Sequence, residues 1–294
     1  GFTYTVNEIM VPSIADPWNA SLILLVVFTG GFINVLRSTG AGQAFAEFAT
    51  KKVNTRQKGQ NFVWGSAFLF SYTEPVLILG TVTRPVTDKL KISRVKLAYI
   101  VDSMGSPVAS MSPISVYAPF ITGLIATQIA ALSLSENPWS LFVQMIPYHL
   151  YGIFAIVGVL LVVNMKIDIG PMYKAEQRAI KTGKLYGEHD KLMIKNTEPE
   201  NESNVDADIF SFLIPLALLF TGIFGVIFWT GDIAANGLTG AFLNADIIFA
   251  ITTGFFLGSV GGILYAKFRY AKPLQDLLNG YVDGIMQVMI VPVI

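Results

Sequence analysis

The 294-residue chain contains no cysteine, only two histidines and few charged residues, which make up 14% of the sequence. Without cysteine it has no disulfide framework, no thiolate zinc cluster and no thiol nucleophile. A phosphate-binding glycine loop, an HExxH zinc motif and a nucleophile elbow are also missing from the sequence. These absences argue against an ATP-driven pump and against an enzyme, so we expect no catalytic residues and no cofactor.

Long apolar segments are what the sequence does contain, and hydrophobic residues make up 53% of it. A helix needs about 20 apolar residues to cross the hydrocarbon core of a bilayer. Four segments have a suitable length: 19–36, 142–164, 209–230 and 247–266. A fifth apolar segment, 97–132, is too long for one straight span. The sequence therefore predicts an all-α polytopic membrane protein whose main partner is the lipid bilayer, with no nucleic acid partner.

Basic residues indicate the orientation. All twenty Lys and Arg residues fall into four patches: 37–58, 84–96, 166–195 and 267–272. Because basic loops concentrate on the cytoplasmic side, we expect all four patches on the inner face of the cell membrane. Trp18, Trp139 and Trp229 would then lie at the outer interface and Trp64 near the inner one, as aromatic belts require.

Segment 62–82 has a basic patch at each end, so it is not a simple span. Its apolar arms, 62–70 and 76–82, each reach about half the depth of the hydrocarbon region. Between them lies Ser71-Tyr72-Thr73-Glu74-Pro75, where the proline favours a break. The pattern predicts a re-entrant hairpin with its polar tip near the midplane, enclosed by protein or by a water-filled cavity.

The long segment 97–132 also has an unusual centre. Residues 102–113 include two prolines, one glycine and four serines, which are poor material for a continuous helix. We expect two half-helices flanking an unwound stretch, since transporters build ion and substrate sites from such discontinuous helices.

The tip and the broken helix supply the candidate binding residues. An ionisable residue at membrane depth is by default a functional candidate, and Glu74 is the first choice for a coupling site. Hard cations prefer oxygen ligands, so Asp102 and Ser103 are also candidates for a sodium site. The full predicted set is Ser71, Tyr72, Thr73, Glu74, Asp102, Ser103, Ser106 and Ser110.

Structural alternatives remain open for the same residues. Glu74 could be a protonated carboxyl that hydrogen-bonds a neighbouring helix, and Asp102 could be a helix N-cap. The tip residues could satisfy local backbone groups, and the serines could serve close packing. We interpret His149 as a packing or interfacial residue and the repeat Gly254, Gly258, Gly262 as a helix-packing face. The acidic residues between 198 and 208 indicate a solvated linker.

Three parts are expected along the chain. Residues 1–61 form a first helix, entered through Asp16 as N-cap and Pro17, and a cytoplasmic connection. Residues 62–135 form half of a transport domain. Residues 136–294 supply scaffold-like helices, a polar cytoplasmic loop over 166–208 and, from about Val282, the start of an inverted second repeat. We expect the chain to be part of a larger transporter.

One stretch resembles a known family. Residues 83–94, reading TRPVTDKLKISR, continue through 96–103, reading KLAYIVDS, to Pro107-Val108-Ala109-Ser110. This stretch is similar to the NhaC-type sodium/proton antiporters, and Gly30-Gly31 and Arg37-Ser38 resemble an earlier helix end of that family. The resemblance covers about residues 16–120. It implies a secondary transporter with inverted repeats, two re-entrant hairpins and an elevator-like transport domain, and a homodimer as its assembly.

The tip departs from that pattern. Many members carry two adjacent aspartates, a tyrosine and a nearby asparagine, whereas this chain has Ser71 and Tyr72 at the aspartates and Pro75 at the asparagine. The main hypothesis is a sodium/proton antiporter-like carrier, with sodium and protons as coupling ions. The departure favours an alternative, a cation-coupled carrier of an amino acid or carboxylate. A passive channel or a structural membrane subunit is the third.

Overall fold

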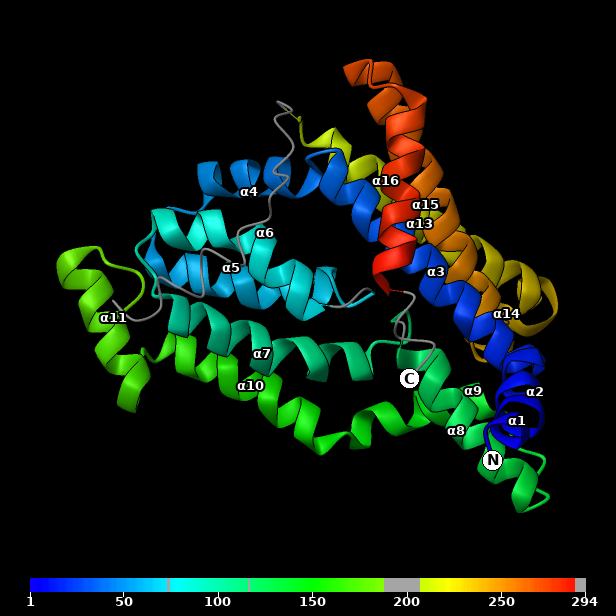
Figure 1. The fold of residues 1–294 in the computed structure, drawn as a ribbon. Helices are drawn as coiled ribbons and strands as arrows, with labels where there is room; N and C mark the ends of the chain where they lie inside the picture. The colour runs from blue at the N-terminus through cyan, green and yellow to red at the C-terminus, as the bar shows by residue number, and fades with distance from the viewer. Residues whose placement is uncertain (73–74, 116, 188–206, 289–294) are drawn as a thin grey trace. The chain divides into compact units, whose positions relative to one another are not determined.

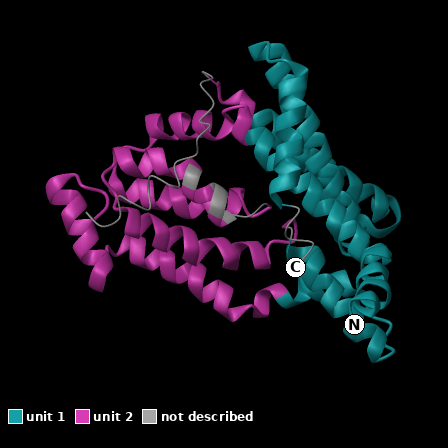
Figure 2. Ribbon diagram, viewed as in Figure 1, with its two compact units in different colours: residues 1–36, 116–145, 213–294 teal, residues 37–115, 146–212 magenta. Residues whose placement is uncertain are grey.

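The computed structural model describes residues 1–72, 75–115, 117–187 and 207–288. Within these ranges the regular structure is helical, with no β-strand, as the sequence predicted. The chain divides into two compact units (Figure 2). Unit 1 comprises residues 1–36, 116–145 and 213–294, and unit 2 comprises residues 37–115 and 146–212.

Unit 1 contains the long apolar helices. Three of its helices are long and apolar enough to cross a membrane, and they match three of the predicted spans: α3 (Pro17–Ser38), α13 (Phe210–Thr230) and α15 (Ile247–Tyr270). Its other elements are α1 (Phe2–Tyr4), η1 (Thr5–Met10), α2 (Val11–Ala15), α8 (Tyr117–Ala131), α9 (Pro138–Met145), α14 (Ile233–Asn244) and α16 (Leu274–Val288). The chain is therefore a membrane protein by the length and composition of its helices.

The start of α3 follows from its sequence. The Asp16 carboxylate oxygen Oδ1 accepts hydrogen bonds from the backbone N–H groups of Trp18 (3.0 Å) and Asn19 (3.1 Å). Pro17 occupies the first helical position, where a missing N–H costs nothing. This is the predicted N-cap arrangement.

The glycine face of α15 packs as predicted. A Cβ added at Gly258 would lie 2.7 Å from Cε2 of Phe32 on α3 and 2.9 Å from the carbonyl oxygen of Pro215 on α13. The equivalent atom at Gly262 would lie 2.6 Å from Val35. Only glycine allows the three helices to approach this closely.

Replacing Gly258 with valine should therefore destabilise unit 1. Because the nearest atom on α13 is backbone, the helix cannot yield by a rotamer change alone, and we expect a loss of about 1–3 kcal/mol in the free energy of unfolding. Thermal unfolding of the purified protein in detergent checks this. Gly225→Ala is the control, since no atom lies within 4 Å of its added Cβ. Equal stability of the two variants would contradict this packing.

Unit 2 holds the hairpin. Its elements are α4 (Ala41–Lys52), α5 (Arg56–Leu69), α6 (Pro75–Lys89), α7 (Arg94–Met111), η2 (Ile146–Tyr148), α10 (Leu150–Asn164) and α11 (Gly170–Thr182). Helices α5 and α6 form the two arms of the predicted hairpin, and α7 and α10 run beside them (Figure 1). Thr55 caps α5 and Ser93 caps α7, each accepting a hydrogen bond from the backbone N–H three residues later.

The discontinuous helix breaks later than predicted. Helix α7 is continuous from Arg94 to Met111, so the expected unwinding across 102–113 is wrong over most of its length. The break begins at Ser112, whose backbone is extended (ψ 121°) directly before Pro113. Proline disfavours helical geometry in the residue that precedes it, which explains the position of the break.

Other element bounds also needed correction. The predicted span 142–164 is interrupted by the 3-10 turn η2, which contains Pro147. His149 then caps α10, because its Nδ1 accepts a hydrogen bond from the backbone N–H of Gly152 (3.2 Å). The last helix begins at Leu274 rather than near Val282. The predicted connections and loops also contain helices, among them α4, α11 and α14, and the acidic residues 198–206 lie outside the described residues.

Candidate ion-binding site

The hairpin tip meets the break after α7. Ser71 Oγ donates a hydrogen bond to the carbonyl oxygen of Phe68 (2.9 Å) and lies 3.1 Å from Ser112 Oγ, so the two hydroxyls share a hydrogen bond. Ser71 is 4% exposed and the Tyr72 side chain is fully buried. Thr73 and Glu74, the other two predicted tip residues, lie outside the described residues. Two interruptions of helical structure that are 41 residues apart in sequence therefore come into direct contact.

Short hydrogen bonds also organise the break itself. Ser115 is fully buried, and its hydroxyl donates to the carbonyl oxygen of Ala109 (2.6 Å). The backbone N–H of Ser112 donates to the carbonyl of Val108 (3.0 Å), and the N–H of Ser115 donates to the carbonyl of Ser112 (3.2 Å). Serine hydroxyls and carbonyl oxygens thus gather where the helix ends. Such oxygens are the ligands that small hard cations prefer.

The second arm of the hairpin continues along α7. A Cβ added at Gly105 would lie 2.5 Å from Cγ2 of Val76, and one added at Gly80 would lie 3.8 Å from Val101. Rising numbers in α6 therefore match falling numbers in α7, so the two helices run antiparallel. The close approach at Gly105 brings the first turn of α6 against the middle of α7.

The predicted residues on α7 take two kinds of position. Asp102 and Ser106 are exposed and lie one turn apart on one face of the helix, while Ser103 and Ser110 are half-buried. The Ser110 hydroxyl is used locally, since it donates to the carbonyl oxygen of Pro107 (3.1 Å). Asp102 lies inside the helix, and Ser93 is the N-cap, so the interpretation of Asp102 as a cap is wrong.

The structure does not bring Asp102 to the contact between Ser71 and Ser112. Ten residues separate it from Ser112 along α7, which corresponds to about 15 Å at a rise of 1.5 Å per residue. A bound cation lies within about 2.6 Å of its oxygen ligands, so one ion cannot contact both residues. Among the described residues no group of three or more His, Cys, Asp or Glu side chains could hold a metal. Asp102 is therefore not a ligand of an ion bound at the contact between Ser71 and Ser112.

Acidic residues at the other end of α7 were missed by the sequence analysis. Glu176 of α11 is 2% exposed, accepts a hydrogen bond from the backbone N–H of Ser93 (2.7 Å) and pairs with Arg56 of α5. Lys96, which is 1% exposed, pairs with Asp168 (2.6 Å). These contacts fasten the segment around α11 to the base of the hairpin and to the start of α7.

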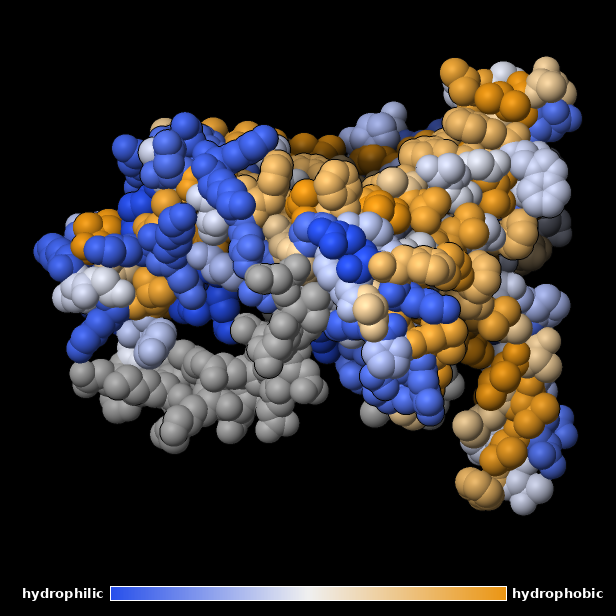
Figure 3. All heavy atoms as spheres, turned by 90° about the horizontal axis from the view of Figure 1, so that it is seen from above, coloured by the Kyte–Doolittle hydropathy of each residue, from blue (hydrophilic) through white to orange (hydrophobic). Residues whose placement is uncertain are grey.

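Three of the four basic patches come together at this end of unit 2. Lys89 donates to the carbonyl oxygen of Thr50 (3.3 Å), and Arg56 donates to the carbonyl oxygens of Leu90 and Lys91. Hydrophilic side chains gather over the α11 end of the unit (Figure 3). The patches 37–58, 84–96 and 166–195 therefore share one end, which is what a common membrane face requires.

A third ion pair at this end is incompletely satisfied. Asp88 and Arg94 are joined by a 2.7 Å contact outside the apolar segments. Burial raises the pKa of Asp88 despite the opposing effects of Arg94 and Arg84, and burial lowers the pKa of Arg94. Among the described residues, Asp88 Oδ1 and Arg94 Nε and Nη1 are buried without a hydrogen-bond partner. Desolvation thus outweighs the attraction within this pair, and Glu176 is the better-compensated acid.

The contact between Ser71 and Ser112 allows a direct test, because the chain has no cysteine. A Ser71→Cys, Ser112→Cys double variant should form a disulfide on mild oxidation, since the two hydroxyl oxygens are 3.1 Å apart. Ser71→Cys with Ser103→Cys is the matched control, because Ser103 lies nine residues before Ser112, about 13 Å away along α7. Mass spectrometry of proteolytic fragments reports the link. A disulfide in the control pair alone would contradict the arrangement.

Comparison with known proteins gives two findings. The sequence profile of the Na+/H+ antiporter family matches residues 116–294, more than half of the chain. An uncharacterized protein of Haemophilus influenzae is 29% identical over 299 residues, which cover 97% of this chain and 55% of the relative. The chain thus spans about half the length of this curated relative. No solved structure matches the chain.

Proposed function

Because the chain belongs to the Na+/H+ antiporter family, we propose that it is part of a secondary transporter in the cell membrane that exchanges sodium for protons. The observation that carries the proposal is the hydrogen bond between the hairpin tip and the break after α7, at Ser71 and Ser112. Two non-helical segments in contact bring together serine hydroxyls and carbonyl oxygens, the groups from which transporters build ion sites. No catalytic chemistry is part of the proposal.

Glu74 is the proposed coupling residue. In sequence it lies between Ser71, which contacts Ser112, and Val76, which packs at Gly105. Its carboxylate would exchange a proton for a cation held by the oxygens of Ser71, Tyr72 and Thr73 and of the break. An antiporter needs such a group, because one site that binds either a proton or a cation, but not both, couples their opposite movements.

Asp102 and Ser106 are proposed as a second station. Both are exposed on one face of α7, and a carboxylate at membrane depth is too costly to face lipid. This face should therefore border water or another polar part of the transporter. Asp102 and Ser103 would receive sodium there, with Ser110 nearer to the break.

The orientation and assembly are also proposals. The shared end of three basic patches supports the cytoplasmic placement of 37–58, 84–96 and 166–195. An inverted second repeat opening with α16 and a homodimer complete the proposed transporter. In the proposed transporter, residues 1–61 supply the first membrane helix and a cytoplasmic connection, residues 62–135 supply half of the transport domain, and residues 136–294 supply scaffold helices.

The finer proposal is that the chain is an NhaC-type antiporter, and the resemblance over residues 83–110 supports it. Ser71 and Tyr72 stand where many NhaC-type antiporters have aspartates, which favours a second candidate. That candidate is a sodium- or proton-coupled carrier of an amino acid or carboxylate, with the hydroxyl-rich tip binding the solute. In both cases Glu74 is the coupling acid.

Proteoliposomes containing the full-length protein test the proposal. An outward sodium gradient should drive proton movement inward with a fixed stoichiometry, read by an entrapped pH dye. If an amino acid or carboxylate must be added before sodium moves, the second candidate is correct. Ion flux far above carrier rates without exchange, or no gradient-driven flux of either kind, would refute secondary transport and indicate a channel or a structural subunit.

A further inference from the structure

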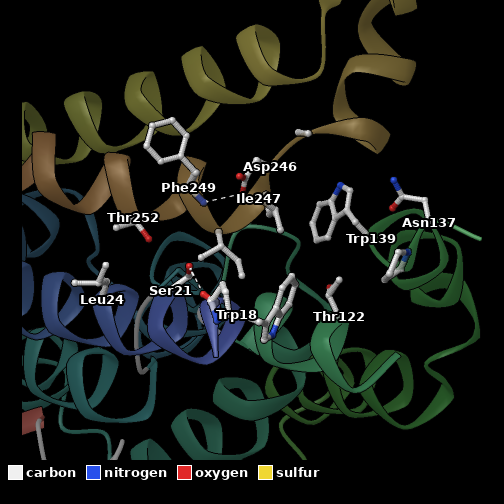
Figure 4. Close-up of a pocket in the computed structure, with 14 residues that line it drawn as sticks. Trp18, Ser21, Leu24, Thr122, Asn137, Trp139, Asp246, Ile247, Phe249 and Thr252 are labelled. Carbon is white, nitrogen blue, oxygen red and sulfur yellow. Dashed lines mark hydrogen bonds between the residues drawn. The ribbon is translucent and has the colours of Figure 1, made fainter. Parts of the chain in front are cut away.

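A cavity of about 570 Å³ lies within unit 1 (Figure 4), whereas the candidate ion site belongs to unit 2. Its walls come from the N-terminal parts of α3, α9 and α15, from the residues just before α9 and α15, and from Thr122 of α8. Trp18 and Trp139, two of the tryptophans expected at the outer membrane interface, line it. The cavity is therefore a separate site at the level of the predicted outer aromatic belt, and none of the proposed ion ligands contributes to it.

The charge of the lining selects for a cation. Asp246 is the one charged residue in the wall, and no Lys or Arg lines the cavity. Oδ1 of Asp246 caps α15 by accepting a hydrogen bond from the backbone N–H of Phe249 (3.1 Å), and the other carboxylate oxygen is not part of this cap. Asp246 is exposed, so its charge is accessible to a ligand. No cationic side chain in this wall would balance the charge of an anion.

The remaining wall suits an apolar body. The indoles of Trp18 and Trp139 lie around the cavity together with Leu24, Ile247 and Phe249 (Figure 4). Trp139 is held in place, since its Nε1 donates to the carbonyl oxygen of Phe242 (2.7 Å) and its ring stacks on Phe142. Indole rings attract cations as well as apolar groups, so they suit a ligand that combines the two.

A second polar group defines the far end of the site. Thr252 Oγ1 lines the cavity and is buried without a hydrogen-bond partner among the described residues. A buried hydroxyl normally makes a hydrogen bond with a backbone carbonyl or another polar group. A polar group of a ligand would satisfy the Thr252 hydroxyl in the same way. Asp246 and Thr252 are six residues apart on α15, which places them about 9 Å apart along the helix.

We propose that this cavity binds an amphiphilic organic cation: a primary ammonium group at Asp246 beside the indoles, an apolar middle of about 9 Å along the start of α15, and a hydroxyl or amide at Thr252. The ammonium group would pair with the Asp246 carboxylate and donate hydrogen bonds to it. The terminal polar group would make a hydrogen bond with the Thr252 hydroxyl. The proposal does not depend on sodium/proton exchange, and it survives if the transport experiment fails.

Calorimetric titration of the full-length protein in detergent tests this with 6-aminohexan-1-ol, whose amine and hydroxyl can span that length. Three probes vary one feature each: hexane-1,6-diol lacks the charge, 6-hydroxyhexanoate reverses it, and hexylamine lacks the hydroxyl. We expect saturable binding of the amino alcohol, about tenfold weaker binding of the diol and no binding of the anion. Equal binding of the diol and the amino alcohol would overturn the cation site.

Matched variants separate charge from helix capping. Asp246→Asn keeps an N-cap, because asparagine caps as well as aspartate, and removes the charge. Asp232→Asn is the control, since Asp232 caps α14 in the same way, by accepting from Ala235 N–H (3.2 Å), but does not line the cavity. Asp246→Asn should weaken amino alcohol binding about tenfold and Asp232→Asn should leave it unchanged. An equal effect of both variants would refute the site.

The Thr252 hydroxyl and the source of the ammonium group are tested separately. Thr252→Val should remove the preference for 6-aminohexan-1-ol over hexylamine, and a preference that persists would refute the role of the hydroxyl. In nanodiscs, binding that is lost in phosphatidylethanolamine but kept in phosphatidylglycerol would identify a lipid ammonium headgroup as the natural ligand. Binding in both would identify a soluble amine. Each nanodisc outcome supports an ammonium site.

Discussion

Replacing Glu74 with glutamine should abolish coupled transport, with gradient-driven flux falling by about tenfold or more in proteoliposomes. Glutamine has nearly the same size and keeps its hydrogen-bonding capacity, but it neither binds a proton nor carries a charge. A site without an ionisable group cannot alternate between proton and cation. The loss should therefore appear in the coupled flux while the amount of folded protein in the membrane stays unchanged.

Two further variants make this prediction specific. Glu47→Gln removes an exposed acid from α4 that makes only a 3.4 Å contact with Gln43, and it should transport normally. Asp102→Asn should reduce the apparent affinity for sodium more than the maximal flux, because its proposed role is to receive the ion. Unchanged coupled flux in Glu74→Gln would exclude the residue from the mechanism, whatever the behaviour of Asp102→Asn.

Replacing Glu176 with alanine should cause the largest loss of stability, about 3–5 kcal/mol. The carboxylate is 2% exposed and serves two partners, the backbone N–H of Ser93 at the cap of α7 and the guanidinium of Arg56 on α5. Its removal leaves a buried N–H without an acceptor and a partly buried positive charge without its acid. The base of the hairpin and the start of α7 would lose their common anchor.

The apparent melting temperature of the detergent-purified protein measures this effect. Glu47→Ala, an exposed acid lost from a neighbouring helix, serves as the control and should change the free energy of unfolding by less than about 0.5 kcal/mol. The melting temperature of Glu176→Gln should lie between those of Glu176→Ala and Glu47→Ala, since the amide oxygen of glutamine can still accept a hydrogen bond from the Ser93 N–H. Equal melting temperatures of Glu176→Ala and Glu47→Ala would show that Glu176 on α11 does not stabilise the start of α5 and α7.

Much of the helical framework could be predicted from the sequence because its signals are local. Asp16 and Pro17 mark a helix start by their own chemistry, and α13 and α15 follow from uninterrupted apolar length. The interruption between α5 and α6 was also predictable, since Pro75 favours a break in the polar stretch 71–75.

The position of the helix break could not be read from local signals. Pro107 and Pro113 are equally strong helix breakers in isolation, yet α7 continues through the first and stops before the second. Packing explains the difference: α7 is held against Val76 of α6 at Gly105 and against Gly152 of the α10 segment at Met111. Tertiary contacts such as these override the local preference for a break.

The contact at the hairpin tip and the ion pairs also differ in how far local sequence signals predict them. Contact between Ser71 and Ser112 was foreseen in kind, as a tip meeting an interrupted helix, although Ser112 itself was not among the predicted ligands. The pairs Arg56–Glu176 and Lys96–Asp168 join residues 120 and 72 positions apart. Charge pattern alone indicates which residues face the same compartment, and it does not indicate which acid meets which base.

We propose that the hairpin formed by α5 and α6 enters the membrane and returns to the side from which it started. Single-cysteine variants at Lys58 and Lys89, both exposed, test it in the cysteine-free chain, with Glu136→Cys marking the opposite side. A membrane-impermeant maleimide should label Lys58→Cys and Lys89→Cys from the cytoplasmic side and Glu136→Cys from the outside. Labelling of Lys58→Cys and Lys89→Cys from opposite sides would contradict the account.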